Sequence, residues 1–187
     1  MQKNIDLIKI QRVLFTLYTM LQQRGYTEVP KIEIDEINRR KMHFICRKNG
    51  KQVFVFFSSS KVIGIQHIEN LMKRLNSQNI FDCIIIYSGI LTPSALKMVQ
   101  NPCIEVFSEN ELLCDIMNHE LMPMIHVMTK EEKNDFLRRT KINECDLPLI
   151  SKNDKISKYF GLSKNDIIKI SRKSETACKY DCYRLVI

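Results

Sequence analysis

Glycine is scarce in this chain of 187 residues: only five are present, at positions 25, 50, 64, 89 and 161. A P-loop and a dinucleotide-binding turn each need closely spaced glycines, because the backbone must approach phosphate groups. The turn that carries the nucleophile of α/β-hydrolases, G-x-S-x-G, does not occur either. The sequence therefore argues against three widespread classes of enzyme.

Long hydrophobic runs are also missing. The run Ile84, Ile85, Ile86 and Tyr87 is among the longest, far below the roughly 18 residues that a membrane-spanning helix needs. The N-terminus lacks the charged segment, apolar stretch and cleavage site of a secretory signal. We expect a soluble protein without a membrane partner, and its hydrophobic content of 44% is sufficient for a packed core.

Two cysteine and histidine patterns could be mistaken for metal sites. His119-Glu120 begins the zinc-protease motif HExxH, but position 123 is a proline, which supplies no ligand and breaks a helix. Cys178 and Cys182 are a single pair of thiols, whereas a structural zinc ion takes four ligands. The total of seven cysteines is odd and irregularly spaced, which favours a reducing compartment. We expect neither a metal nor a cofactor.

The net charge of +8 is spread evenly, because each of the parts 1–118 and 119–187 has four more basic than acidic residues. A basic excess suits nucleic acid or an acidic protein surface. Two interpretations of the basic clusters remain open, namely contact with phosphates and plain exposure at the ends of helices and hairpins. The clusters are Arg39-Arg40-Lys41, Arg47-Lys48, Lys51 and Lys73-Arg74.

Helices and strands alternate over residues 1–118. Apolar spacing predicts helices over 10–21, ending before Gly25, and over 68–75. Asn49-Gly50 predicts a hairpin between strands 42–46 and 52–57, and Ile84 lies in a strand, 82–87, buried on both faces of a sheet. A short helix begins near Pro93, a strand covers 103–107, and a capping box at Ser108 starts a helix to about Met117. We predict an α/β domain with a sheet and flanking helices.

This order of elements is similar to that of restriction-endonuclease-type nucleases. Such enzymes place E-x-K on a strand of the sheet, so that the carboxylate and the lysine hold Mg²⁺ and the attacking water. The corresponding strand, 52–57, reads QVFVFF and has neither residue. The pattern therefore favours a degraded nuclease scaffold without nuclease activity.

Residues 119–187 predict a small α+β domain. A capping box at Thr129 starts a helix to about Arg139, Leu147-Pro148 breaks the chain, and Gly161 ends a short helix over 154–160. Two strands, 166–172 and 183–187, complete the domain. A core of this size is marginal by itself, so docking to a partner would stabilise it.

Ordered motifs along the chain resemble the shared fifth subunit of eukaryotic nuclear RNA polymerases, whose C-terminal part is similar to a small subunit of archaeal RNA polymerase. The family pattern H-x-L-x-P-x-H-x-x-[LM]-[ST] begins at His119 and is matched at Pro123 and Thr129, whereas the second histidine of the chain, His126, lies one residue later than the pattern places it. Later matches are Tyr159, Gly161, Arg172, Ser174, Glu175, Thr176, Tyr183 and Arg184. In the N-terminal part the matches are Arg24-Gly25-Tyr26, residues 55–57, and Thr92, Pro93, Ser94 and Ala95.

The resemblance implies a non-catalytic subunit of a DNA-directed RNA polymerase. It implies that 1–118 form a jaw beside downstream double-stranded DNA, with Thr92, Pro93, Ser94 and Ala95 nearest the duplex. It also implies that 119–187 form an assembly domain that docks on the largest subunit and joins other polymerase subunits. The expected location is the nucleus, or the host cytoplasm or virion if a large DNA virus encodes the chain.

The chain departs from the family pattern at four positions: Cys178 and Asn165 replace glycines, Lys155 replaces a proline, and Leu149 replaces a basic residue. Asn165 can still adopt a positive φ. For Glu175 and Arg184 we expect internal structural roles slightly more than direct partner contacts. The alternatives from other classes are a nuclease-like DNA-processing enzyme and a free-standing DNA-binding regulator.

Overall fold

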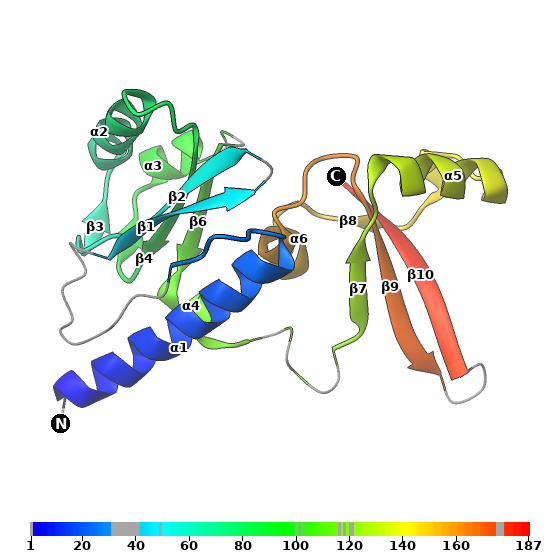
Figure 1. Cartoon of the computed structure of the whole chain (residues 1–187), viewed down its shortest axis with the longest axis horizontal. Coiled ribbons are helices and arrows are strands. Elements are labelled where there is room, and N and C mark those ends of the chain that lie inside the picture. Colours follow the sequence, from blue (N-terminus) through cyan, green and yellow to red (C-terminus); the bar gives the residue numbers. More distant parts are fainter. Residues whose placement is uncertain are drawn as a thin grey trace. The chain divides into compact units, whose positions relative to one another are not determined.

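The chain divides into two compact units, Met1–Asp115 and Ile116–Ile187 (Figure 1). The computed structural model describes residues 2–30, 42–48, 50–99, 101, 103–115, 117, 119, 122–174 and 178–187. Each unit has its own sheet and its own helices, and we describe each by itself.

A four-stranded sheet of order β1-β2-β4-β6 forms the centre of the N-terminal unit. The hairpin of β1 (His43–Lys48) and β2 (Lys51–Phe57) is antiparallel, and its turn contains Gly50 with φ +79°. Strands β2, β4 (Asp82–Tyr87) and β6 (Ile104–Ser108) are parallel. The hairpin and the central strand were both predicted from the sequence.

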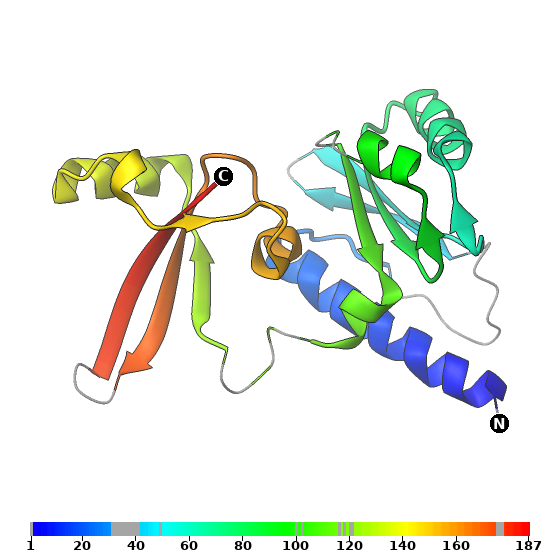
Figure 2. The same cartoon turned by 180° about the vertical axis from the view of Figure 1, so that it is seen from behind.

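Helices cover both faces of this sheet, as Figures 1 and 2 show from opposite sides. On one face, Cys83 and Ile85 pack in a core with α2 (Ile65–Asn76) and α3 (Pro93–Met98). The opposite face is covered by α1 (Gln2–Gln23) and α4 (Glu109–Leu113). Because successive side chains of a strand point to opposite faces, Ile84 and Ile86 are buried on the side of α1.

Helix α1 buries one apolar stripe, which consists of Ile10, Val13, Leu14, Leu17, Met20 and Leu21. The helix begins at Gln2, earlier than the apolar spacing predicted, because its first turns lie before that stripe. Gly25 follows its end with φ +86°, and the Tyr26 N–H donates to the Leu21 carbonyl at 3.0 Å. Glycine tolerates this left-handed conformation, so the predicted helix stop at Gly25 is confirmed.

A two-stranded parallel ribbon was not predicted. Strand β3 (Val62–Ile63) pairs with β5 (Ile90–Leu91). The chains approach so closely that a Cβ on Gly89 would lie 1.9 Å from the carbonyl oxygen of Lys61. Strands of two residues carry no detectable alternation, so sequence reasoning could not find this ribbon.

The C-terminal unit is built on a sheet of order β7-β9-β10-β8. Strands β7 (Met124–Val127), β9 (Ile167–Ser174) and β10 (Cys178–Val186) are antiparallel neighbours, and β8 (Leu149–Ile150) is parallel to β10. On one face, α5 (Lys130–Thr140) supplies Phe136 to a core with Ile167 and Leu185. On the other face, α6 (Lys155–Phe160) contributes to a core with Ile168 and Ile170. A 3-10 turn, Glu144–Asp146, precedes β8.

Two of the boundaries predicted from the sequence were wrong, and two strands were missed. Helix α4 ends at Leu113 rather than near Met117, because Leu112 is the last side chain of that helix that the core buries and Cys114 is extended. Strand β10 begins at Cys178 rather than Tyr183, since its polar first half is fixed by pairing with β9. Strands β7 and β8 were missed, because each is too short to show a pattern by itself.

The predicted helix caps are present. At Thr129 the side chain accepts from the Glu132 N–H at 3.2 Å, and the Glu132 carboxylate accepts from the Thr129 N–H at 2.8 Å. Ser108 and Glu111 form the same reciprocal box. Gly161, with φ +62°, ends α6, and Asn165 has φ +73°, so the expectation of a positive φ at Asn165 is confirmed.

Cys178, where the resemblance led us to expect a glycine, has φ +57°. A side chain at such a φ costs about 1 kcal/mol, although glycine also loses more chain entropy on folding. We therefore expect Cys178→Gly to raise the free energy of unfolding by about 0.5 to 1 kcal/mol. Denaturant unfolding would measure the change. Cys178→Ala is the control, because it removes the thiol but keeps Cβ, and an equal gain in both variants would contradict the strain argument.

Candidate interaction surfaces

The turn predicted to lie nearest DNA begins directly after β5. The Thr92 N–H donates to the Ile63 carbonyl at 3.1 Å, and its side chain accepts from the Ala95 N–H at 3.3 Å. Pro93 occupies the first turn of α3, and Ala95 is completely buried. Pro93 and Ser94 are exposed. The four residues therefore divide into two that fix the turn and two that the turn presents to solvent.

The Arg24-Gly25-Tyr26 motif has an internal role. The Arg24 guanidinium, whose side chain is only 4% exposed, donates to both carboxylate oxygens of Glu105 on β6, at 2.8 and 3.1 Å. It also lies 5.8 Å from the ring centroid of Phe107. The Lys48 ammonium donates to the Arg24 carbonyl. These contacts fix the end of α1 to the sheet.

Loss of the Glu105 charge should therefore destabilise the N-terminal unit, because it removes the carboxylate that accepts two hydrogen bonds from the buried Arg24 guanidinium. We expect Glu105→Gln to lower the free energy of unfolding by about 2 to 4 kcal/mol. The matched control is Glu28→Gln, which removes an exposed pair with Arg47 at 3.4 Å and should cost less than about 1 kcal/mol. Denaturant unfolding of both variants would test this, and similar losses would contradict it.

An open groove of about 590 Å³ lies between α5 and the sheet of the C-terminal unit. Its apolar lining includes Met124, which is 78% exposed, and Phe136, which stacks on Tyr183 with ring centroids 4.1 Å apart. Charged side chains occupy the rest of the lining, namely Glu132, Asp135, Arg139, Lys169 and Lys179. The groove thus combines an apolar floor with side chains of both charges.

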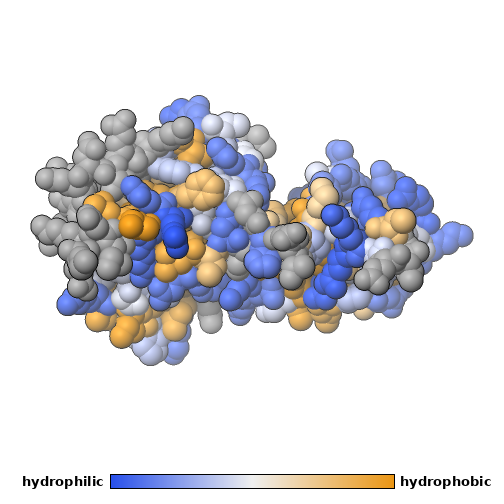
Figure 3. Space-filling view, turned by 90° about the horizontal axis from the view of Figure 1, so that it is seen from below, coloured by the Kyte–Doolittle hydropathy of each residue, from blue (hydrophilic) through white to orange (hydrophobic). Residues whose placement is uncertain are grey.

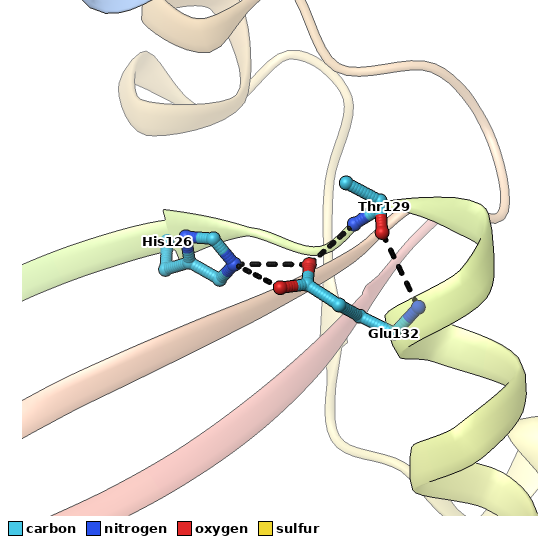
Figure 4. A network of polar contacts seen from close by, with 3 residues as sticks. All are labelled: His126, Thr129 and Glu132. Atoms are coloured by element: carbon cyan, nitrogen blue, oxygen red, sulfur yellow. Dashed lines mark hydrogen bonds and ion pairs between the residues drawn. The ribbon is translucent and has the colours of Figure 1, made fainter.

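A polar network joins β7 to the start of α5 (Figure 4). His126 Nε2 lies 3.0 and 3.2 Å from the two carboxylate oxygens of Glu132, which also closes the capping box at Thr129. The Thr129 N–H and then the imidazole lower the pKa of Glu132 from its usual value of 4.5. Because the folded pKa is depressed, this contribution to stability is complete above pH 4.5 and is lost as the pH falls through the folded pKa.

A second network links β9 and β10 on the groove side. The Ser171 hydroxyl donates to one oxygen of Asp181 at 2.6 Å, and the Lys169 ammonium lies 2.9 Å from the other. The hydroxyl and then the ammonium lower the pKa of Asp181, while the hydrogen bond to Asp181 raises the pKa of Lys169. None of these three was predicted as a site residue, although the alternation of Lys169 and Ser171 with buried isoleucines in β9 was a usable signal.

The structure does not gather the remaining predicted site residues into one place. Arg184 is half-buried and lies opposite Ile168 in the ladder, so it points away from the groove. Within the described part of the chain, no hydrogen bond or ion pair is seen for its side chain. Glu175 and Thr176 lie outside the described residues.

The other predicted residues lie along the chain of the C-terminal unit. His119 is exposed, Pro123 precedes β7, and Arg172 is exposed in the middle of β9. Ser174 is the last residue of β9. Buried Tyr159 packs edge-on against Phe160 within α6. Tyr159 and Gly161 thus have structural positions.

Neither a metal cluster nor a membrane-spanning helix is found among the described residues. No group of three or more His, Cys, Asp or Glu side chains there is placed to hold a metal ion. None of the described helices combines the length and hydrophobicity needed to cross a membrane. Figure 3 shows, on one face, hydrophobic side chains in separate patches among hydrophilic ones.

Comparison with known proteins defines the class. Residues 114–186 match the family model for the C-terminal domain of RNA polymerase Rpb5. The chain is also 34% identical to the RPABC1 subunit of DNA-directed RNA polymerases I, II and III from Caenorhabditis elegans, over 98% of each chain. The corresponding protein of Dictyostelium discoideum is 30% identical, over 97% of this chain and 99% of its own length.

The chain belongs to the RPABC1 family of RNA polymerase subunits. The identification made from sequence motifs is therefore confirmed over nearly the whole chain. The prediction of a non-catalytic polymerase subunit is likewise confirmed at the level of the family.

Proposed function

We propose that this chain joins other polymerase subunits through its C-terminal unit and contacts downstream duplex DNA through its N-terminal unit. Family membership supports the assembly with other subunits, since its relatives are named as polymerase subunits. The single observation that carries the DNA contact is the turn at Thr92, which is fixed internally yet presents Pro93 and Ser94 to solvent.

We further propose that the C-terminal unit docks on the largest polymerase subunit and that the whole chain works in the nucleus. The match of residues 114–186 to a family model supports an assembly role for this unit. If a large DNA virus encodes the chain, its location is the host cytoplasm or the virion. The eukaryotic relatives favour the nucleus.

The N-terminal unit is best explained as a nuclease-type scaffold that has lost its chemistry. Its sheet with helices on both faces is compatible with that origin. Strand β2, Lys51–Phe57, has no carboxylate, so the metal-binding E-x-K of such enzymes has no counterpart there. This favours a jaw that holds DNA over the alternative of a DNA-processing enzyme.

The assembly proposal is tested by Arg184→Glu. We expect the half-buried cation to contribute to docking, so reversal of its charge should reduce recovery of the two largest polymerase subunits by a tagged chain at least about tenfold. Lys164→Glu, an exposed change outside the strands, is the control. Circular dichroism of each purified variant separates misfolding from lost docking, and normal incorporation of a folded Arg184→Glu chain would refute the proposal.

The DNA contact is tested by Ser94→Glu, which adds a negative charge where we place the duplex. Assembly should be unchanged, whereas release of downstream DNA from a stalled polymerase should accelerate about three- to tenfold through repulsion from phosphates. The control is Gln78→Glu, an exposed residue beyond the far end of α2. Equal release rates for the two variants would count against a duplex at this turn.

A further inference from the structure

Strand β7 (Met124–Val127) forms one edge of the sheet in the C-terminal unit. The strand order β7-β9-β10-β8 gives it a single neighbour, β9, among the described strands. The Met128 N–H donates to the Ile167 carbonyl at 3.0 Å, just beyond the end of β7. Backbone groups of successive residues in a strand point to opposite sides in the plane of the sheet. The N–H and C=O groups of Ile125 and Val127 therefore point outward, away from β9.

This outer edge of β7 is open in the described part of the chain, where no backbone hydrogen bond is seen on the outer side of Ile125 and Val127. Exposed edges are a ready template for pairing with another strand, and proteins often protect them with a lysine or a proline. The four residues of β7 read MIHV and include neither. The edge therefore has the groups to accept a further strand and no charged side chain to prevent it.

Side chains on both faces of β7 define the chemistry of an added strand. Ile125 and Val127 are half-buried and pack against the core beside α6, so an apolar side chain of the next strand would cover them on that face. On the groove face, Met124 is 78% exposed and offers a second apolar contact. The groove also contains the carboxylates of Glu132 and Asp135, which repel the phosphates of a nucleic acid. These features favour an extended polypeptide with apolar side chains.

We propose that β7 accepts an extended segment of another polymerase subunit as a fifth strand of this sheet. The segment pairs with the backbone of Ile125 and Val127, and its alternate side chains cover the apolar residues on the two faces. This inference rests on the proposed assembly with other polymerase subunits. A second copy of the chain is a poorer occupant, because two strands of four residues bury far less than the roughly 1,200 Å² of a stable interface, whereas another subunit adds contacts elsewhere.

Hydrogen exchange of the unmodified full-length chain tests this backbone pairing directly. In the free chain the amide hydrogens of Ile125 and Val127 should exchange rapidly, because they point away from β9. In the assembled polymerase their exchange should be at least about a hundredfold slower, since each would be held in a hydrogen bond to the added strand. The Met128 amide is the internal control, because its N–H already donates to Ile167 and its exchange should change much less.

A proline at the outward position removes the donor without breaking the ladder between β7 and β9, because proline is tolerated where the N–H of an edge strand faces outward. Val127→Pro should lower the recovery of other polymerase subunits by a tagged chain about tenfold. Leu149→Pro, at the opposite edge of the same sheet, is the matched control. The carbonyls of Pro148 and Ile150 accept hydrogen bonds from β10, so the Leu149 N–H also points outward. Circular dichroism of the free variants checks that both are folded.

The outcomes distinguish this inference from the function on which it rests. Failure of the tagged chain to recover any polymerase subunit would overturn both. Normal recovery with rapid exchange of the Ile125 and Val127 amides in the complex would overturn the inference alone, as would equal recovery by the two folded proline variants. Slow exchange of these amides in the free chain, together with a dimer in sedimentation, would assign the edge to a second copy and would also overturn it.

Discussion

Burial of β4 on both faces is the constraint on which the N-terminal unit depends. Its four central residues, from Cys83 to Ile86, are at most 2% exposed, so the strand must lie between two layers of helices. Its parallel neighbours β2 and β6 then need crossover connections, which α2 and α3 provide. The Thr92 turn lies on the connection from β4 to β6, after β5 and at the start of α3.

The C-terminal unit also contains a central strand that is buried on both faces, although this unit has fewer residues. Strand β9 alternates between two small cores, with Ile167 toward α5 and Ile168 toward α6. Where α5 does not cover the sheet, the alternation continues with Lys169 and Ser171, which are paired with Asp181 instead of being buried in a core. Cross-strand pairing therefore extends the sheet beyond its apolar part and creates the charged groove.

Sequence reasoning succeeded where one local signal was sufficient. The helix stop at Gly25, the capping box at Thr129 and the apolar run of β4 each contain their own explanation within a few residues. It failed where pairing between distant segments decides the structure, as in the ribbon of β3 and β5 and the polar half of β10. The salt bridge of Arg24 with Glu105 could not be predicted for the same reason, because the two residues are 81 positions apart in the sequence.

The motifs that identify the family consist largely of residues that fix the fold. They therefore do not identify the residues that contact partners. Thr92 and Ala95 fix a turn, Gly161 ends a helix, and Thr129 caps another. Such residues are constrained by backbone geometry whatever surface the protein presents. Pro93, Ser94 and Arg184 differ, because the described contacts leave their side chains available. Partner contacts should therefore be sought at these three positions.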